Sequence, residues 1–106
     1  MAPSKHGTIA AIRQIAQRLE AVCAVFGMGS YFRGEPFNDL DLVVVVAPTE
    51  TITEVGRTIR TALAPIAEMV GVPIDVTILT QAEFAERPLR DMHTLSTIYD
   101  TSQENA

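Results

Sequence analysis

Residues 27–46 read GMGSYFRGEPFNDLDLVVVV, and this stretch decides the fold. It contains a glycine–serine pair, Gly29 and Ser30, and it ends in an apolar run dense in valine. Such a run is typical of a strand that is covered on both faces of a sheet. Asp39 and Asp41 stand at the start of this run, where charged side chains are rare unless something offsets their desolvation.

The spacing of the two aspartates suggests a metal site. On a strand, Asp39 and Asp41 point to one face, while Leu40 and Leu42 point to the opposite face, into the core. Neighbouring carboxylates raise each other's pKa unless a cation lies between them. Their oxygens suit Mg²⁺, which binds one or two carboxylates together with substrate phosphates. The alternative is a solvated pair at the rim of the sheet.

Asp75 is a second anomaly of the same kind. It interrupts the apolar segment VPIDVTIL at residues 72–79, which otherwise resembles an inner strand. If this strand lies beside the strand over 39–47, its carboxylate reaches the same patch. Three convergent carboxylates are what a two-metal site for phosphoryl or nucleotidyl transfer requires. The alternative is an edge-strand aspartate that faces water.

The glycine–serine turn predicts an anion site beside the carboxylates. Gly29 allows a tight turn and a close approach of the backbone to a ligand. Ser30 is expected to cap the short turn SYFRG, with N–H groups and a hydroxyl aimed at an anion, and Gly34 is expected to end it. Arg33 can add a positive charge near phosphate oxygens, although such an arginine is more often a surface residue. An ordinary turn with a helix cap is the alternative.

Composition narrows the class of protein. The 106 residues fit a single domain over 1–106, with the ends 1–7 and 101–106 expected to be flexible. A net charge of −5 argues against direct binding of nucleic acid, and no apolar run is long enough to cross a membrane. The single cysteine, Cys23, permits no internal disulfide and indicates a reducing compartment, so the cytoplasm is expected.

Periodicity predicts the order of elements. The passage between the first two strands is too short for a crossover helix, so the sheet should be mixed. The expected fold class is α/β, in the α+β sense: a small mixed sheet flanked by helices. The expected elements are a helix from Thr8 with an apolar stripe from Ile9 to Cys23, a strand over 23–27, a strand over 39–47, a helix after Thr51, a strand over 72–79, a short helix after Thr80 and an edge strand over 95–100.

Two capping boxes and two prolines predict where helices start, break and end. The sequences at Thr51–Glu54 and Thr80–Glu83 match capping boxes, in which side chains and backbone N–H groups bond reciprocally at a helix start. Pro65 is expected to kink or restart the longer helix. Pro88 is expected to end the shorter one.

These segments together resemble the polymerase-β-like nucleotidyltransferase superfamily, and in particular its stand-alone members, the minimal nucleotidyltransferases. The family pattern is a hydrophobic strand ending in Gly-Ser, a strand with Asp-x-Asp, and a later strand with a third acidic residue. The resemblance runs from the first helix through the third strand and implies a small mixed sheet flanked by helices. The matching residues are Gly29, Ser30, Asp39, Asp41 and Asp75.

Two features depart from that pattern. Only eight residues separate Ser30 from Asp39, at or slightly below the usual spacing. Asn38 stands where many members of the family have serine. Both features concern the loop beneath the triphosphate, so they bear on substrate preference more than on the metal site.

The resemblance implies an activity. It implies Mg²⁺-dependent transfer of a nucleoside monophosphate, AMP from ATP, to an acceptor with release of pyrophosphate. Asp39 and Asp41 would hold two Mg²⁺ ions. Asp75 would complete one metal site and orient or deprotonate the acceptor hydroxyl. The backbone around Gly29 and Ser30 would hold the triphosphate.

The resemblance also implies a partner. Stand-alone prokaryotic members pair with a separate helical protein, often of the HEPN class, in a toxin–antitoxin module. This chain would be the antitoxin, in a homo- or hetero-oligomer, and in some systems the antitoxin adenylylates the toxin. Two alternatives stay open: a non-catalytic antitoxin that acts by contact alone, and a regulatory module that binds ATP without transfer.

Overall fold

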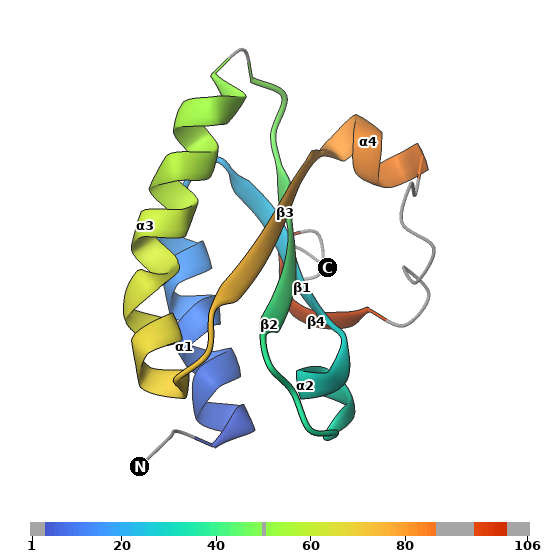
Figure 1. Ribbon diagram of the computed structural model, residues 1–106. Helices are drawn as coiled ribbons and strands as arrows, with labels where there is room; N and C mark the ends of the chain where they lie inside the picture. The colour runs from blue at the N-terminus through green and yellow to red at the C-terminus, as the bar shows by residue number, and fades with distance from the viewer. Residues whose placement is uncertain (1–3, 50, 87–94, 102–106) are drawn as a thin grey trace.

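The computed structural model describes residues 4–49, 51–86 and 95–101, which form a four-stranded sheet flanked by helices (Figure 1). The elements are, in chain order, α1 Lys5–Arg18, β1 Val22–Met28, α2 Ser30–Arg33, β2 Leu40–Val46, α3 Ile52–Val70, β3 Ile74–Thr80, α4 Gln81–Glu86 and β4 Ser96–Asp100. The strand order is β3-β2-β1-β4. β1 is antiparallel to both neighbours, whereas β2 and β3 are parallel, so the predicted mixed sheet is confirmed.

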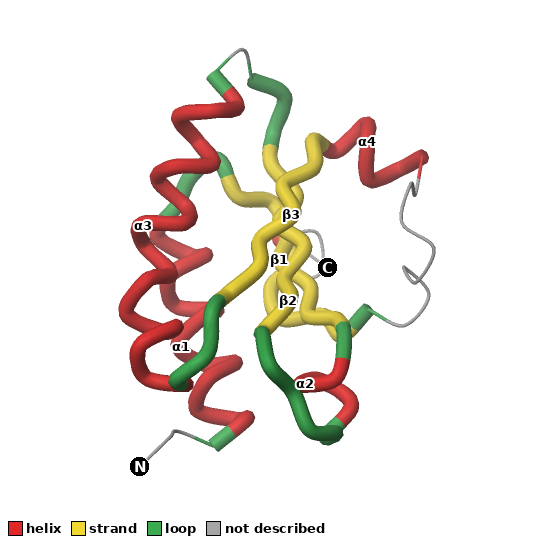
Figure 2. Tube along the Cα trace, in the orientation of Figure 1, coloured by secondary structure: helices red, strands yellow, loops and turns green. Residues whose placement is uncertain are grey.

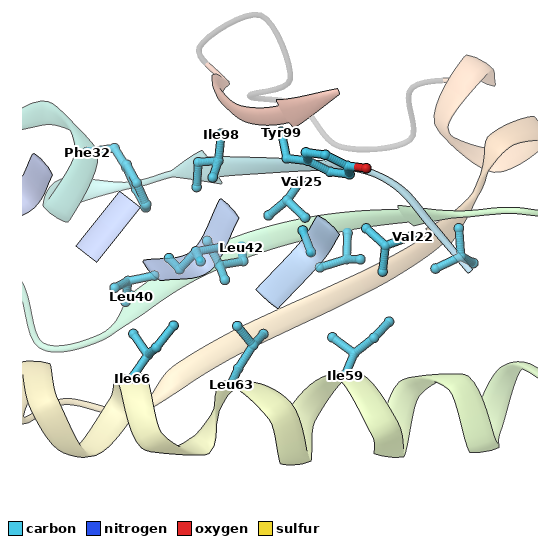
Figure 3. Packing of buried hydrophobic residues seen from close by; sticks show 14 of the residues in the cluster. Val22, Val25, Phe32, Leu40, Leu42, Ile59, Leu63, Ile66, Ile98 and Tyr99 are labelled. Atoms are coloured by element: carbon cyan, nitrogen blue, oxygen red, sulfur yellow. The ribbon is translucent and has the colours of Figure 1, made fainter. Parts of the chain in front are cut away.

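One face of the sheet forms the main core against α1 and α3. Leu40 and Leu42 of β2 are fully buried on this face, as the strand alternation predicts. They belong to one cluster with Ile12 of α1 and with Leu63 and Ile66 of α3 (Figure 3). Full burial of an aliphatic side chain of this size stabilises the fold by about 1.5–3 kcal/mol. This face therefore holds the two long helices on the sheet.

The opposite face is apolar over part of its length. Val43 and Val45 of β2 pack there with Phe26 of β1 and Leu79 of β3, so β2 is covered on both faces as predicted. Phe84 of α4 stacks on Phe26, with ring centroids 5.1 Å apart. This cover lies toward the end of β2 and β3 from which α4 leaves. The other end, where β2 begins, lies beside α2 (Figure 2).

The first helix begins earlier and ends sooner than predicted. α1 starts at Lys5, and the Ser4 hydroxyl caps it by accepting a 3.0 Å hydrogen bond from the Gly7 N–H. Residues 5–7 therefore belong to a helix and not to a flexible arm. The helix ends at Arg18, so its apolar stripe does not extend to Cys23. Cys23 lies half-buried in β1, as the predicted strand over 23–27 requires.

The two predicted capping boxes have different outcomes. At Thr80 the box is formed: its N–H donates to Glu83 Oε1 at 2.9 Å, and the Glu83 N–H donates to its hydroxyl at 3.2 Å. At Thr51 the prediction is wrong, because this N-cap residue makes no side-chain cap hydrogen bond. Its hydroxyl and its N–H each bond the Thr49 hydroxyl at 3.0 Å. A local threonine pair thus competes successfully with the cap.

α3 continues through Pro65, so of the two predicted effects, a kink or a restart, the restart does not occur. Proline removes one helical hydrogen bond, and its ring crowds the carbonyl four residues earlier, which belongs here to Thr61. Both residues are exposed, so water can satisfy this carbonyl. Leu63 and Ile66 on either side of the proline are buried, and their packing holds the helix together across the defect.

At the C-terminal end, β4 forms the predicted edge strand, whereas β3, whose sequence resembles an inner strand, is the other edge of the sheet. The Thr101 hydroxyl, at the start of the segment predicted to be flexible, donates a 3.1 Å hydrogen bond to the Cys23 carbonyl. The helix end predicted at Pro88 and the tail 102–106 lie outside the described residues. Within the part of the chain that the structure describes, no helix is long and apolar enough to cross a membrane.

We predict that Pro65→Ala raises the melting temperature. Alanine restores an N–H that can bond the Thr61 carbonyl and removes the ring clash, a gain of roughly 2 kcal/mol once the greater freedom of the unfolded chain is counted. Pro48→Ala, in the loop after β2, is the control because it frees the unfolded chain without restoring a helical bond. A thermal unfolding curve for Pro65→Ala at or below that of the wild type would contradict the prediction.

Candidate functional site

The structure brings the three predicted aspartates together. Asp39 immediately precedes β2, Asp41 is the second residue of β2, and Asp75 is the second residue of β3. Asp41 and Asp75 are direct partners in the parallel ladder. One carboxylate oxygen from each of the three residues lies within 4.8 Å of the other two. The sequence predicts that the three carboxylates converge if the two strands are neighbours. The strands are neighbours, and the carboxylates converge.

The strand register fixes the face on which the carboxylates lie. Leu40 pairs with Ile74, and the Leu40 N–H donates a 3.0 Å hydrogen bond to the Pro73 carbonyl at the start of the ladder. Side chains alternate along a strand, so burial of Leu40 and Leu42 forces Asp41 to the other face. The apolar pattern thus directs the acidic side chains out of the main core.

The carboxylates differ in their exposure and interact electrostatically. Asp39 and Asp41 are half-buried, whereas Asp75 is exposed. Burial is the largest cause that raises the pKa of Asp41 above its ordinary value, and the negative charges of Asp39 and Asp75 raise it further. A site of this kind favours a cation, because a positive charge between the carboxylates reverses their mutual repulsion.

The donor set fits a small divalent cation. Mg²⁺ binds oxygen at about 2.0–2.1 Å, so two oxygens on one ion lie at most about 4.2 Å apart. The observed limit of 4.8 Å is close to that span, and small side-chain rotations can close the difference. Mg²⁺ and Mn²⁺ also suit carboxylate oxygens better than soft ligands do. The residues present could therefore hold such an ion and leave coordination positions for substrate.

The glycine turn packs directly against this cluster. Gly29 is the N-cap of α2, with φ +87° and ψ −169°, a conformation that is essentially restricted to glycine. A Cβ at this position would lie 2.8 Å from Oδ2 of Asp41. Gly34 ends the turn in the left-handed conformation, as predicted. Gly29 is thus required by the backbone conformation and also by the neighbouring carboxylate.

Ser30 does not cap the turn, contrary to the prediction. Gly29 occupies the N-cap position, and Ser30 is the first helical residue. Its hydroxyl accepts a 3.4 Å hydrogen bond from Nη2 of Arg33, whose Nε forms a 2.7 Å ion pair with Glu35. The N–H groups of Ser30 and Tyr31 have no partner inside the turn, because the first N–H groups of a helix precede its first hydrogen bond. Backbone donors are therefore placed next to the acidic cluster.

Sequence reasoning missed the contact that seats this turn on the sheet. A Cβ on Gly27 of β1 would collide with the ring of Phe32, so the ring packs directly on the backbone of Gly27. Phe32 itself is buried. A glycine inside a strand is a known signal of such a close approach, but it does not name the residue that approaches.

Comparison with solved structures identifies a related fold. One structure, a "putative nucleotidyltransferase from Sulfolobus solfataricus", matches with a TM-score of 0.51 at 16% sequence identity, over 90% of this chain and 78% of that chain. At this identity the likeness concerns the fold, a small mixed sheet with flanking helices. No protein-family model and no curated protein matches the chain.

We predict that Asp41→Asn stabilises the metal-free protein at neutral pH. Because the folded pKa is raised, the folded state of the wild type binds more protons than the unfolded chain between the ordinary and the raised pKa. Its stability therefore falls as the pH rises through that window and stays lower above it. Asparagine avoids this loss. Urea unfolding in the presence of a chelator should show the gain near pH 7 and lose it below about pH 3.5, where both states are protonated.

Glu68→Gln is the control for this change. Glu68 is exposed on α3, so its substitution removes the same charge away from the cluster. Glu68→Gln should give no comparable gain in stability against urea, either near pH 7 or below about pH 3.5. A gain from Asp41→Asn that does not depend on pH would show that electrostatics is not its cause.

We predict that Gly29→Ala weakens Mn²⁺ binding about 10–100-fold, because the new methyl group displaces the carboxylate of Asp41, and groups that support metal ligands have effects of this size. Gly34→Ala is a matched control at the other end of the same turn. Its φ of +75° is also positive, but it lies in the left-handed region, where alanine is less strained than at Gly29, and its Cβ would have no atom within 4 Å. It should lower stability by about 1–2 kcal/mol and preserve Mn²⁺ affinity. Equal Mn²⁺ affinities in calorimetric titrations of the two variants would refute the role of the contact.

Proposed function

We propose that this chain is a nucleotidyltransferase that moves a nucleoside monophosphate, AMP from ATP, to an acceptor with release of pyrophosphate. The observation that carries the proposal is the cluster of Asp39, Asp41 and Asp75 beside the Gly29 turn. A shared fold with a structure named for this activity supports it. The order of the turn, the acidic pair and the third carboxylate along the chain agrees with the family pattern that the sequence resembles.

The three carboxylates would have different roles in the reaction. Two Mg²⁺ ions, when bound, would neutralise the triphosphate and lower the pKa of the attacking hydroxyl. Asp39 and Asp41, two residues apart at the start of β2, would hold the ions, and Asp75 would complete one of the two metal sites. Asp75 is the exposed member, so it would face the acceptor, orient its hydroxyl and accept its proton. The acceptor oxygen then bonds to the α-phosphorus as the bond from this phosphorus to the bridging oxygen breaks, and pyrophosphate leaves.

The turn would bind the triphosphate. The backbone N–H groups of Ser30 and Tyr31 are donors of the kind that hold phosphate oxygens. Arg33 is paired with Glu35, but both side chains are more than half exposed, at 55% and 54%. Such surface pairs contribute little to stability, so Arg33 can exchange Glu35 for a phosphate oxygen, which binds guanidinium well.

We further propose that the acceptor is a partner protein, a helical protein of the HEPN class, and that the chain acts as its antitoxin. This step is supported by the resemblance to stand-alone nucleotidyltransferases and by the exposure of Asp75, which leaves the acceptor side of the cluster accessible. A large acceptor surface can then be supplied by the partner. Oligomers of the two chains follow from this proposal.

We predict that Asp75→Asn lowers transfer by at least about a hundredfold, the scale expected when a group that acts mainly in the transition state is lost. Asparagine keeps the shape of the side chain, so the fold and Mn²⁺ binding through Asp39 and Asp41 should remain. The measurement is labelling of the co-expressed partner from α-labelled ATP, beside a melting curve. Thr77→Val, at the next exposed position of β3, is the matched control and should retain activity.

The same assay separates the proposal from its rivals. Equal labelling by the wild type and Asp75→Asn would remove the third carboxylate from the mechanism. Tight complex formation without any labelling by the wild type would indicate an antitoxin that acts by contact alone. Saturable ATP binding without transfer to any acceptor would indicate a nucleotide sensor.

A further inference from the structure

We infer that Lys5 is a positioning residue that fixes the Gly29–Arg33 turn for nucleotide binding; the inference rests on the proposed function, in which this turn holds the triphosphate. Nζ of Lys5 donates a 2.6 Å hydrogen bond to the carbonyl of Phe32. The bond is partly buried and joins the first turn of α1 to α2, far apart in the sequence.

The Phe32 carbonyl is a suitable acceptor for an ammonium group. The carbonyls before it are satisfied within the turn: the Glu35 N–H donates to Ser30 at 3.0 Å, and the Gly34 N–H donates to Tyr31 at 3.3 Å. Carbonyls in the last turn of a helix have no partner further along the helix. A positive charge at this end is favourable, and hydrogen bonds from a charged donor are roughly twice as strong as neutral ones.

Phe32 carries this restraint as far as Gly29, which borders the acidic cluster. Its ring packs on Gly27, and its N–H donates a 3.2 Å hydrogen bond to the Gly29 carbonyl. Gly29 in turn lies against Asp41, with too little space for a methyl group between them. A continuous path of contacts therefore leads from Lys5 through Phe32 and Gly29 to the edge of the metal site.

A turn of four residues needs such support. Helices this short are not stable by themselves, because nucleation costs more than one or two hydrogen bonds return. The orientation of Ser30–Arg33 must therefore come from contacts with other elements, and Lys5 provides a hydrogen bond from α1. The three aspartates lie on β2 and β3 or next to them, so their geometry does not depend on this bond. Loss of Lys5 should thus weaken nucleotide binding and spare metal binding.

The test compares Lys5→Met with Arg18→Met. Arg18 lies at the other end of α1, and its Nε bonds only the Gln14 carbonyl of the same helix among its described contacts, at 3.3 Å. Both variants remove one positive charge from α1, but only Lys5→Met frees the turn. We expect Lys5→Met to raise KM for Mg²⁺–ATP about tenfold, the scale of a lost hydrogen bond to a charged group, with kcat and Mn²⁺ affinity nearly unchanged. Arg18→Met should resemble the wild type.

A second readout does not depend on activity. Amide hydrogen exchange at Phe32 and Arg33, whose N–H groups both bond the Gly29 carbonyl, should become about tenfold faster in Lys5→Met and stay unchanged in Arg18→Met. Unchanged exchange, or an unchanged KM in an active enzyme, would overturn the role of Lys5. Faster exchange in a protein whose wild type neither binds nor transfers nucleotide would uphold Lys5 as the support of the turn and overturn the proposed function instead.

Discussion

The site depends on the parallel pairing of β2 with β3, whose register places Asp41 directly beside Asp75. Parallel neighbours cannot be joined by a tight turn, so the chain needs a crossover, and α3 supplies it on the main core face. α1 and α3 lie together on one face of the sheet (Figure 1). Because Leu40 and Leu42 are buried on that face, strand alternation places Asp41 on the other face. A helix that carries no residue of the site thus determines where the site lies.

Hydrophobic burial outweighs the electrostatic cost of the cluster. A shift of the β2 register by one residue would reduce the repulsion between the carboxylates. The same shift would turn Asp41 into the core and expose Leu40 and Leu42. Each leucine is worth about 1.5–3 kcal/mol when buried, and an unpaired buried carboxylate costs several kcal/mol more. Repulsion between half-exposed carboxylates is smaller, since solvent screens it. The apolar pattern therefore enforces an acidic cluster that the charges alone would disperse.

The sequence predicts those features that repeat along a strand and fails where a local group has competing partners. The shared face of Asp39 and Asp41 follows from strand alternation, and the mixed sheet follows from the short passage between the first two strands. The place of Asp75 follows once two strands are taken as neighbours. The cap at Thr51 is not predictable in this way, because a hydroxyl of a nearby threonine competes for the same donor. The effect of Pro65 depends on which side of α3 faces solvent. Contacts between elements, such as Lys5 with Phe32, carry no periodic signal at all.

The metal ligands and the nucleotide-binding turn have separate structural supports. The aspartates are fixed by a strand ladder and by buried leucines, and these contacts resist small displacements because the interior is closely packed. The turn is a single helical turn, held by the burial of Tyr31 and Phe32 and by the hydrogen bond from Lys5, and a single helical turn opens locally at low cost. The two parts meet at Gly29 and Asp41, where the absence of a side chain lets the turn approach the carboxylate. A substrate that contacts both the turn and the aspartates would therefore couple two parts of the site that have separate structural supports. The backbone at Gly29 is the point at which triphosphate binding and metal binding can influence each other.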